Sequence, residues 1–158
     1  MKTLISALAL TTALTSALSA PALARPVTLT TNLTKYGGRG AYLALYVTNA
    51  KGAYVGSVWM AGGKSKYYKH LRDWKRASGG SRSQVNGITG ASVGAGRQLK
   101  ITIDLADALF DAGYNLRIDA AVENFRDSPS EVVVPLTTKG AGKPVSGRRY
   151  IHDFTYDM

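Results

Sequence analysis

The stretch RQLKITIDL, residues 97–105, alternates apolar and polar side chains without interruption. Leu99, Ile101, Ile103 and Leu105 fall on one face of an extended chain, and polar or charged residues separate them. Successive side chains of a β-strand point to opposite faces, so this period of two predicts a strand with one buried face. The stretch therefore indicates a half-buried antiparallel sheet.

The same period recurs along most of the chain. Strands are predicted at VTLTTNLT (27–34), AYLALYVTNA (41–50), YVGSVWMAG (54–62), YNLRIDAAVE (114–123), EVVVPLT (131–137) and YIHDFTY (150–156). In the second of these, Leu43, Leu45 and Val47 share one face. In the third, Val55 and Trp59 are expected to point together into the core. Turn signals at short intervals favour a mainly β fold, a single antiparallel β-sandwich with one short helix.

That helix is predicted at KSKYYKHLRDWKRAS, residues 64–78. Tyr67, Leu71 and Trp74 recur at i, i+4 and i+7, the spacing of one helical face. Ser65 is a candidate N-cap and Gly79 a candidate stop, which gives about three turns. The opposite face is basic and carries Lys66, Lys69, Arg72, Lys75 and Arg76.

Residues 1–24 have the pattern of a secretory signal peptide. Lys2 precedes an apolar run at 4–18, and Ala22-Leu23-Ala24 forms a small-x-small site, so cleavage is expected after Ala24. A membrane anchor is the alternative, but the run is shorter than the roughly 20 residues that a span needs, and Thr and Ser interrupt it. Removing 24 of 158 residues leaves 134, an exported domain at 25–158 of a size that one core can support.

Composition limits the chemistry. The chain has no Cys, which excludes disulfides and thiol catalysis. Its formal charge of +10 favours anionic partners, although export argues against nucleic acid. His70 and His152 are the only histidines, so no metal site is expected, and no G-x-S-x-G elbow indicates a hydrolase. We expect a carrier or binding module, with no catalytic residues of its own.

The segment NGITGAS, residues 86–92, resembles an acceptor motif for covalent FMN. In that motif an Asp and two free positions precede Ser or Thr, Gly, Ala and Thr, and a flavin transferase esterifies FMN from FAD to the last hydroxyl. Thr89, Gly90 and Ala91 match. Asn86 replaces the Asp, and Ser92 replaces the final Thr. The hydroxyl of Ser92 is a competent nucleophile when activated, but an amide at Asn86 cannot act as a base.

The mature chain also resembles a family of predicted periplasmic proteins, domain of unknown function 2271. The resemblance includes the strand ending at Val58-Trp59, the helix with Tyr68, Leu71 and Trp74, the TGAS segment, and the Gly113-Tyr114 strand leading to Glu123. It implies an immunoglobulin-like β-sandwich in the periplasm. It also implies a flavoprotein for electron transfer that works with an FAD-dependent flavin transferase and a PepSY-type membrane reductase, with FMN on Ser92.

Around such a flavin, Lys75, Arg76, Arg82 and Arg97 are candidates to balance the phosphate. Tyr68 falls off the apolar stripe and is the candidate ring contact.

Two alternatives remain. NGITGAS is a polar turn if Gly90 has a positive φ and Thr89 or Ser92 bonds the local backbone. The chain is then a flavin-free binding module, whose basic helix and basic loop at 137–149 contact an acidic partner or a membrane surface. Purified protein would be yellow in the first case and colourless in the second.

Overall fold

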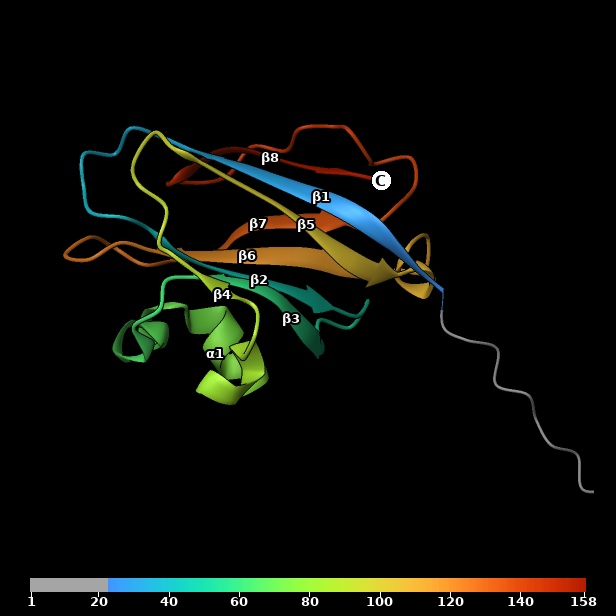
Figure 1. The fold of residues 1–158 in the computed structure, drawn as a ribbon, viewed down its shortest axis with the longest axis horizontal. Coiled ribbons are helices and arrows are strands. Elements are labelled where there is room, and N and C mark those ends of the chain that lie inside the picture. Colours follow the sequence, from blue (N-terminus) through green and yellow to red (C-terminus); the bar gives the residue numbers. More distant parts are fainter. Residues whose placement is uncertain (1–22) are drawn as a thin grey trace, which may run out of the picture.

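The computed structural model describes residues 23–158, which form two β-sheets packed face to face (Figure 1). The first sheet has the order β5-β1-β8, with β1 at Ala24–Leu33, β5 at Gln98–Ala106 and β8 at Ile151–Asp157. The second has the order β4-β3-β2-β6-β7 and comprises β2 (Tyr42–Thr48), β3 (Tyr54–Ala61), β4 (Thr89–Gly90), β6 (Asn115–Ala121) and β7 (Ser128–Pro135).

The prediction of a mainly β sandwich with one short helix is confirmed. One pair departs from the antiparallel rule, because β4 runs parallel to β3. The predicted signal peptide lies outside the described residues, except for Leu23 and Ala24.

The main core lies between the two sheets and follows the predicted alternation. Leu43, Leu45 and Val47 of β2 face it, and all three are at most 2% exposed. The three-stranded sheet contributes Val27 and Leu29 together with the apolar face of β5. Burying a side chain of this size contributes about 1.5–3 kcal/mol, so the interlocked faces fix the strand registers.

A second cluster covers the other face of the five-stranded sheet. Ala44, Tyr46 and Met60 point away from the main core and pack against a helical segment. Strand β2 is therefore buried on both faces. Figure 1 shows the helical segment on the side of the five-stranded sheet that faces away from the other sheet.

The helical segment differs from the single helix predicted. It consists of a 3₁₀ helix, η1, at Ser65–His70 and an α-helix, α1, at Arg72–Ser78. The buried side chains are Tyr68, Leu71 and Trp74, which recur every three residues. Side chains three apart eclipse in 3₁₀ geometry, whereas they drift around an α-helix. The predicted stop is confirmed, because Gly79 ends α1 with φ 84°.

Val55 and Trp59 do not share one face of β3, so this prediction was wrong. Val55 is 49% exposed, while Trp59 packs against the main core. Val55 itself has no partner in the β2–β3 register, because one irregularity lies between Tyr54 and Gly56, and Val58 is left out at the other. The extra residue of a β-bulge is unpaired, so the period of two does not relate Val55 to Trp59.

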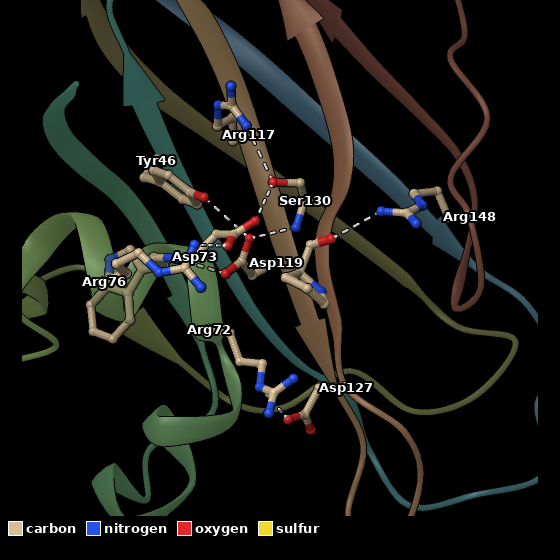
Figure 2. A network of polar contacts seen from close by, with 11 residues as sticks. Tyr46, Arg72, Asp73, Arg76, Arg117, Asp119, Asp127, Ser130 and Arg148 are labelled. Carbon is tan, nitrogen blue, oxygen red and sulfur yellow. Dashed lines mark hydrogen bonds and ion pairs between the residues drawn. The ribbon is translucent and has the colours of Figure 1, made fainter. Parts of the chain in front are cut away.

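The carboxylate of Asp119, on β6, joins three elements beneath α1 (Figure 2). Its Oδ2 accepts the backbone N–H of Trp74 at 2.7 Å, and its Oδ1 accepts the backbone N–H of Ser130 at 2.8 Å. The hydroxyl of Tyr46 donates to Oδ1 at 3.2 Å. Asp119 is fully buried, and this burial raises its pKa, an effect that the two backbone donors oppose. The network extends outward, because Ser130 Oγ donates to Asp73 at 2.6 Å.

A second buried carboxylate joins the two sheets. Glu131 of β7 accepts four backbone N–H groups at Oε1, from residues 148–151 at 2.6–3.0 Å. Ser128 Oγ donates to its Oε2. These bonds hold the chain that enters β8 against β7, so Glu131 fixes one edge of the sandwich.

We predict that Asp119→Ala lowers the free energy of unfolding by about 3 kcal/mol, because it leaves two backbone donors without an acceptor at about 1–3 kcal/mol each. Urea unfolding with the slope held common measures this loss. Asp104→Ala removes a carboxylate on the exposed face of β5 and serves as the control, expected within about 0.5 kcal/mol of wild type. An equal, small effect of both substitutions would show that Asp119 does not anchor α1.

Candidate functional site

The NGITGAS segment is fixed to the sandwich at both ends. Met60 N donates to Ile88 O and Gly62 N donates to Gly90 O, each at 2.8 Å, which makes Thr89–Gly90 an edge strand. Just beyond Ser92, Val93 exchanges two backbone hydrogen bonds with Ala41, at 2.7 and 2.9 Å. Ser92 thus lies on a short extended link between two paired positions, and not in a turn.

The glycine of TGAS has a different role from the one expected. A positive φ occurs at Gly87 (77°), whereas Gly90 is not among the glycines with positive φ. A Cβ at position 90 would instead lie 2.8 Å from the Trp59 ring, closer than carbon atoms approach. Only glycine allows the segment to pack on Trp59, so close approach explains this residue.

The two hydroxyls of the segment differ in availability. Thr89 Oγ1 donates to the carbonyl of Val85 at 2.7 Å, which closes the loop locally. Ser92 is exposed and lines a cavity of about 740 Å³. Asn86 and Ala91 are also exposed, but neither lines the cavity. Ser92 is therefore the hydroxyl of the segment that a ligand in the cavity would meet.

The cavity combines an aromatic wall with charged side chains. Tyr42, Tyr67 and Phe125 form the wall, and the Tyr42 and Tyr67 rings meet edge to face with centroids 5.3 Å apart. Arg39 and Lys64 contribute positive charge. Ligand sites typically have volumes of 300–1,000 Å³, and a few polar groups in them fix orientation.

One acidic side chain also lines the cavity, and its charge is compensated. Glu123 Oε2 lies 3.4 Å from Arg39 Nε, and its Oε1 accepts from the Tyr67 hydroxyl at 3.3 Å. Lys64 forms no ion pair among the described residues 23–158. The cavity therefore retains one uncompensated positive side chain for an anionic group.

A glycine-rich loop borders the cavity. A Cβ on Gly40 would lie 2.6 Å from Ser92 Oγ, and one on Gly38 would lie 2.8 Å from the Phe125 ring. Both positions leave room that any larger residue would fill. Sequence reasoning missed this loop; the run Gly37-Gly38-Arg39-Gly40 between two predicted strands was the available signal.

Tyr68, the candidate ring contact predicted from the helix pattern, does not line the cavity. Tyr68 is 3% exposed and packs against Trp74, whereas Tyr67 lines the cavity. The Tyr68 hydroxyl donates to Gly62 O at 3.0 Å, and burial raises its pKa, which the Thr89 hydroxyl opposes. Tyr68 thus supports the NGITGAS segment from beneath. Trp74 is fully buried and Trp59 packs against the core, as predicted.

The cations near the cavity also come from other parts of the chain than predicted. The expected phosphate partners were Lys75, Arg76, Arg82 and Arg97, and none of them lines the cavity. The Lys and Arg side chains that line the cavity are those of Arg39 and Lys64. No sequence spacing connects these two residues with Ser92, because the fold brings together three separate segments.

The chain matches one family of known proteins. Residues 24–153 match the family described as predicted periplasmic protein (DUF2271). The chain belongs to the DUF2271 family. The family description makes this DUF2271 protein periplasmic, as predicted. No curated protein and no solved structure matches it.

Two further features of the described residues bear on function. Within residues 23–158, no helix of this DUF2271 protein has the length and apolar character of a membrane span. In the same range, no three His, Cys, Asp or Glu side chains gather in a way that would hold a metal ion.

Proposed function

We propose that this protein is a periplasmic electron-transfer module that carries FMN covalently through a phosphoester at Ser92. The observation that carries the proposal is the position of Ser92, an exposed hydroxyl on a strand-paired link at the edge of a cavity with aromatic walls and positive charge. A secured backbone matters here, because the attachment point sets where the flavin lies.

The residues present fit this group. Lys64 and Arg39 would attract the phosphate, which forms strong hydrogen bonds with charged donors. Tyr42, Tyr67 and Phe125 would pack against the planar ring. The flavin would supply the electron chemistry, and the protein would supply attachment, orientation and electrostatics.

Attachment transfers the FMN group from FAD to the hydroxyl of Ser92. Ser92 Oγ forms a bond to the phosphorus of the FMN half of FAD, the pyrophosphate bond breaks, and AMP leaves. The hydroxyl proton passes to a base of the flavin transferase, because Asn86 cannot accept it. A PepSY-type membrane reductase is the proposed electron donor.

The intact mass of protein produced together with a flavin transferase tests the proposal. We expect wild type to gain the mass of one FMN less one water, and Ser92→Ala to remain unmodified. An unmodified wild type would overturn the proposal. Retained modification in Ser92→Ala would overturn the assignment of Ser92.

A matched pair of glycine substitutions separates access to Ser92 from stability. Gly40→Ala places a methyl group against Ser92 Oγ and should lower the modified fraction severalfold. Gly63→Ala has nothing within 4 Å and serves as the control. Equal modification of both variants would show that Gly40 does not keep the hydroxyl accessible.

The flavin-free binding module is the second candidate, and the distribution of charge favours it. Residues 64–82 carry seven Lys and Arg and one Asp, a net +6, while all described residues together carry 19 positive and 10 negative side chains, a net +9. All seven basic side chains are exposed. An anionic partner would be attracted to this basic segment more strongly than to the rest of the surface.

Two triple variants of equal charge change test this. Lys66, Lys69 and Lys75 changed to Glu should lower the salt concentration that releases the protein from immobilised polyglutamate more than Lys35, Lys51 and Lys100 changed to Glu, which lie outside both the basic segment and the basic loop at 137–149. All six lysines are exposed, so stability should change little. Equal release of the two variants would show that the basic segment is not a binding surface.

A further inference from the structure

His70 lies at the end of η1 and lines the same cavity as Ser92. Its Nδ1 lies 3.1 and 3.3 Å from the two carboxylate oxygens of Asp127. Arg72 Nε lies 3.5 Å from Asp127 Oδ2, and Figure 2 shows these two side chains pointing toward one another. Asp127 therefore connects the imidazole to α1. The side chain of Asp127 is 18% exposed, so little water competes for these contacts.

This contact defines the two ring nitrogens of His70. A carboxylate only accepts hydrogen bonds, so Nδ1 carries the proton that is donated to Asp127. In the neutral ring, Nε2 then has the free lone pair, and it is the nitrogen where a further proton binds. The His70 side chain is 43% exposed, so solvent protons reach it.

The charged groups around His70 are already arranged in pairs. Glu123 interacts with Arg39 and Tyr67 across the cavity, and Asp127 interacts with Arg72 and with His70 itself. Lys64 adds one positive charge to the lining. Among the lining residues, histidine is the type whose charge ordinarily changes between pH 5 and 8. His70 is the one histidine among the described residues that line the cavity.

We propose that His70, oriented by Asp127, is the proton-holding side chain of this cavity, and that it binds a proton at Nε2 when a flavin on Ser92 is reduced. The inference rests on the proposed function. Two electrons from the reductase, with one proton taken from solvent by the ring, would leave one negative charge on the flavin. A second proton from solvent would bind at Nε2 of His70 and offset that charge, and no bond between His70 and the flavin would form or break.

The coupling acts in both directions. Negative charge near an imidazole raises its pKa, and a protonated imidazole favours reduction of the group beside it. A charge about 6–8 Å away at a protein surface changes proton affinity by about threefold to tenfold or more. Protonation of His70 would thus make the reduction potential depend on pH near neutrality.

A second histidine, His152, serves as an internal control for His70. His152, on β8, also pairs with a carboxylate, with Nδ1 2.6 Å from Asp153 Oδ2. It is 74% exposed and does not line the cavity. The two histidines share one type of partner, but His70 alone of the two lines the cavity with Ser92.

Imidazole NMR titration of three samples tests the proposal: unmodified Ser92→Ala, flavin-loaded wild type, and the loaded protein reduced with dithionite. We expect the His70 midpoint to rise on loading, and to rise again on reduction by about threefold or more in proton affinity. The His152 midpoint should stay constant. A His70 midpoint that reduction does not change would overturn the role of His70 while leaving the proposed function intact.

The reduction potential gives a second measurement. His70→Gln should lose the part of the pH dependence that wild type shows between pH 5 and 8, whereas His152→Gln should keep it. Identical profiles in all three proteins would overturn the proposal. A wild type whose mass shows no flavin would overturn both this inference and the proposed function, so the two failures are distinguishable.

Discussion

A fully buried carboxylate, Asp119, positions the helical segment on which the candidate site depends. Removing a charge from water is costly, and here three donors from three elements offset that cost. Because Asp119 accepts from the first turn of α1 and from β7, it sets how α1 lies on the five-stranded sheet. Helix η1 precedes α1 directly, so the positions of Tyr67 and His70 in the cavity wall follow from the same contact.

The second constraint is steric and comes from glycine. Gly90 allows the NGITGAS segment to pack on Trp59, and Gly40 leaves space around the hydroxyl of Ser92. Both are close approaches between segments far apart in the sequence. The cavity is therefore formed by the helical segment, a glycine-rich loop, residues 121–125 at the end of β6 and the link that carries Ser92. Such a preorganised arrangement is what a covalently carried group needs to keep one orientation.

The sequence predicts the sandwich well, because alternation reports directly on which face of a strand is buried. RQLKITIDL and AYLALYVTNA lie in the core as their patterns require. The helical segment was harder, since a spacing of three and a spacing of four both fit its apolar residues. A spacing of four places Tyr67 on the buried face, whereas a spacing of three places Tyr68 there and leaves Tyr67 in the cavity wall. The sequence does not predict that Arg39 and Lys64 line the same cavity as Ser92. This placement is a property of the tertiary fold, and no local pattern encodes it.

If Ser92 and the aromatic cavity form one site, an attached flavin ring lies against Tyr42, Tyr67 and Phe125. Flavin fluorescence of the loaded protein, measured in the folded state and again in urea, tests this arrangement, because contact with tyrosine rings quenches that emission. We expect weak emission when the protein is folded and a severalfold increase on unfolding. Equal emission in both states would show that the ring lies free in solvent and that Ser92 and the cavity do not form one site.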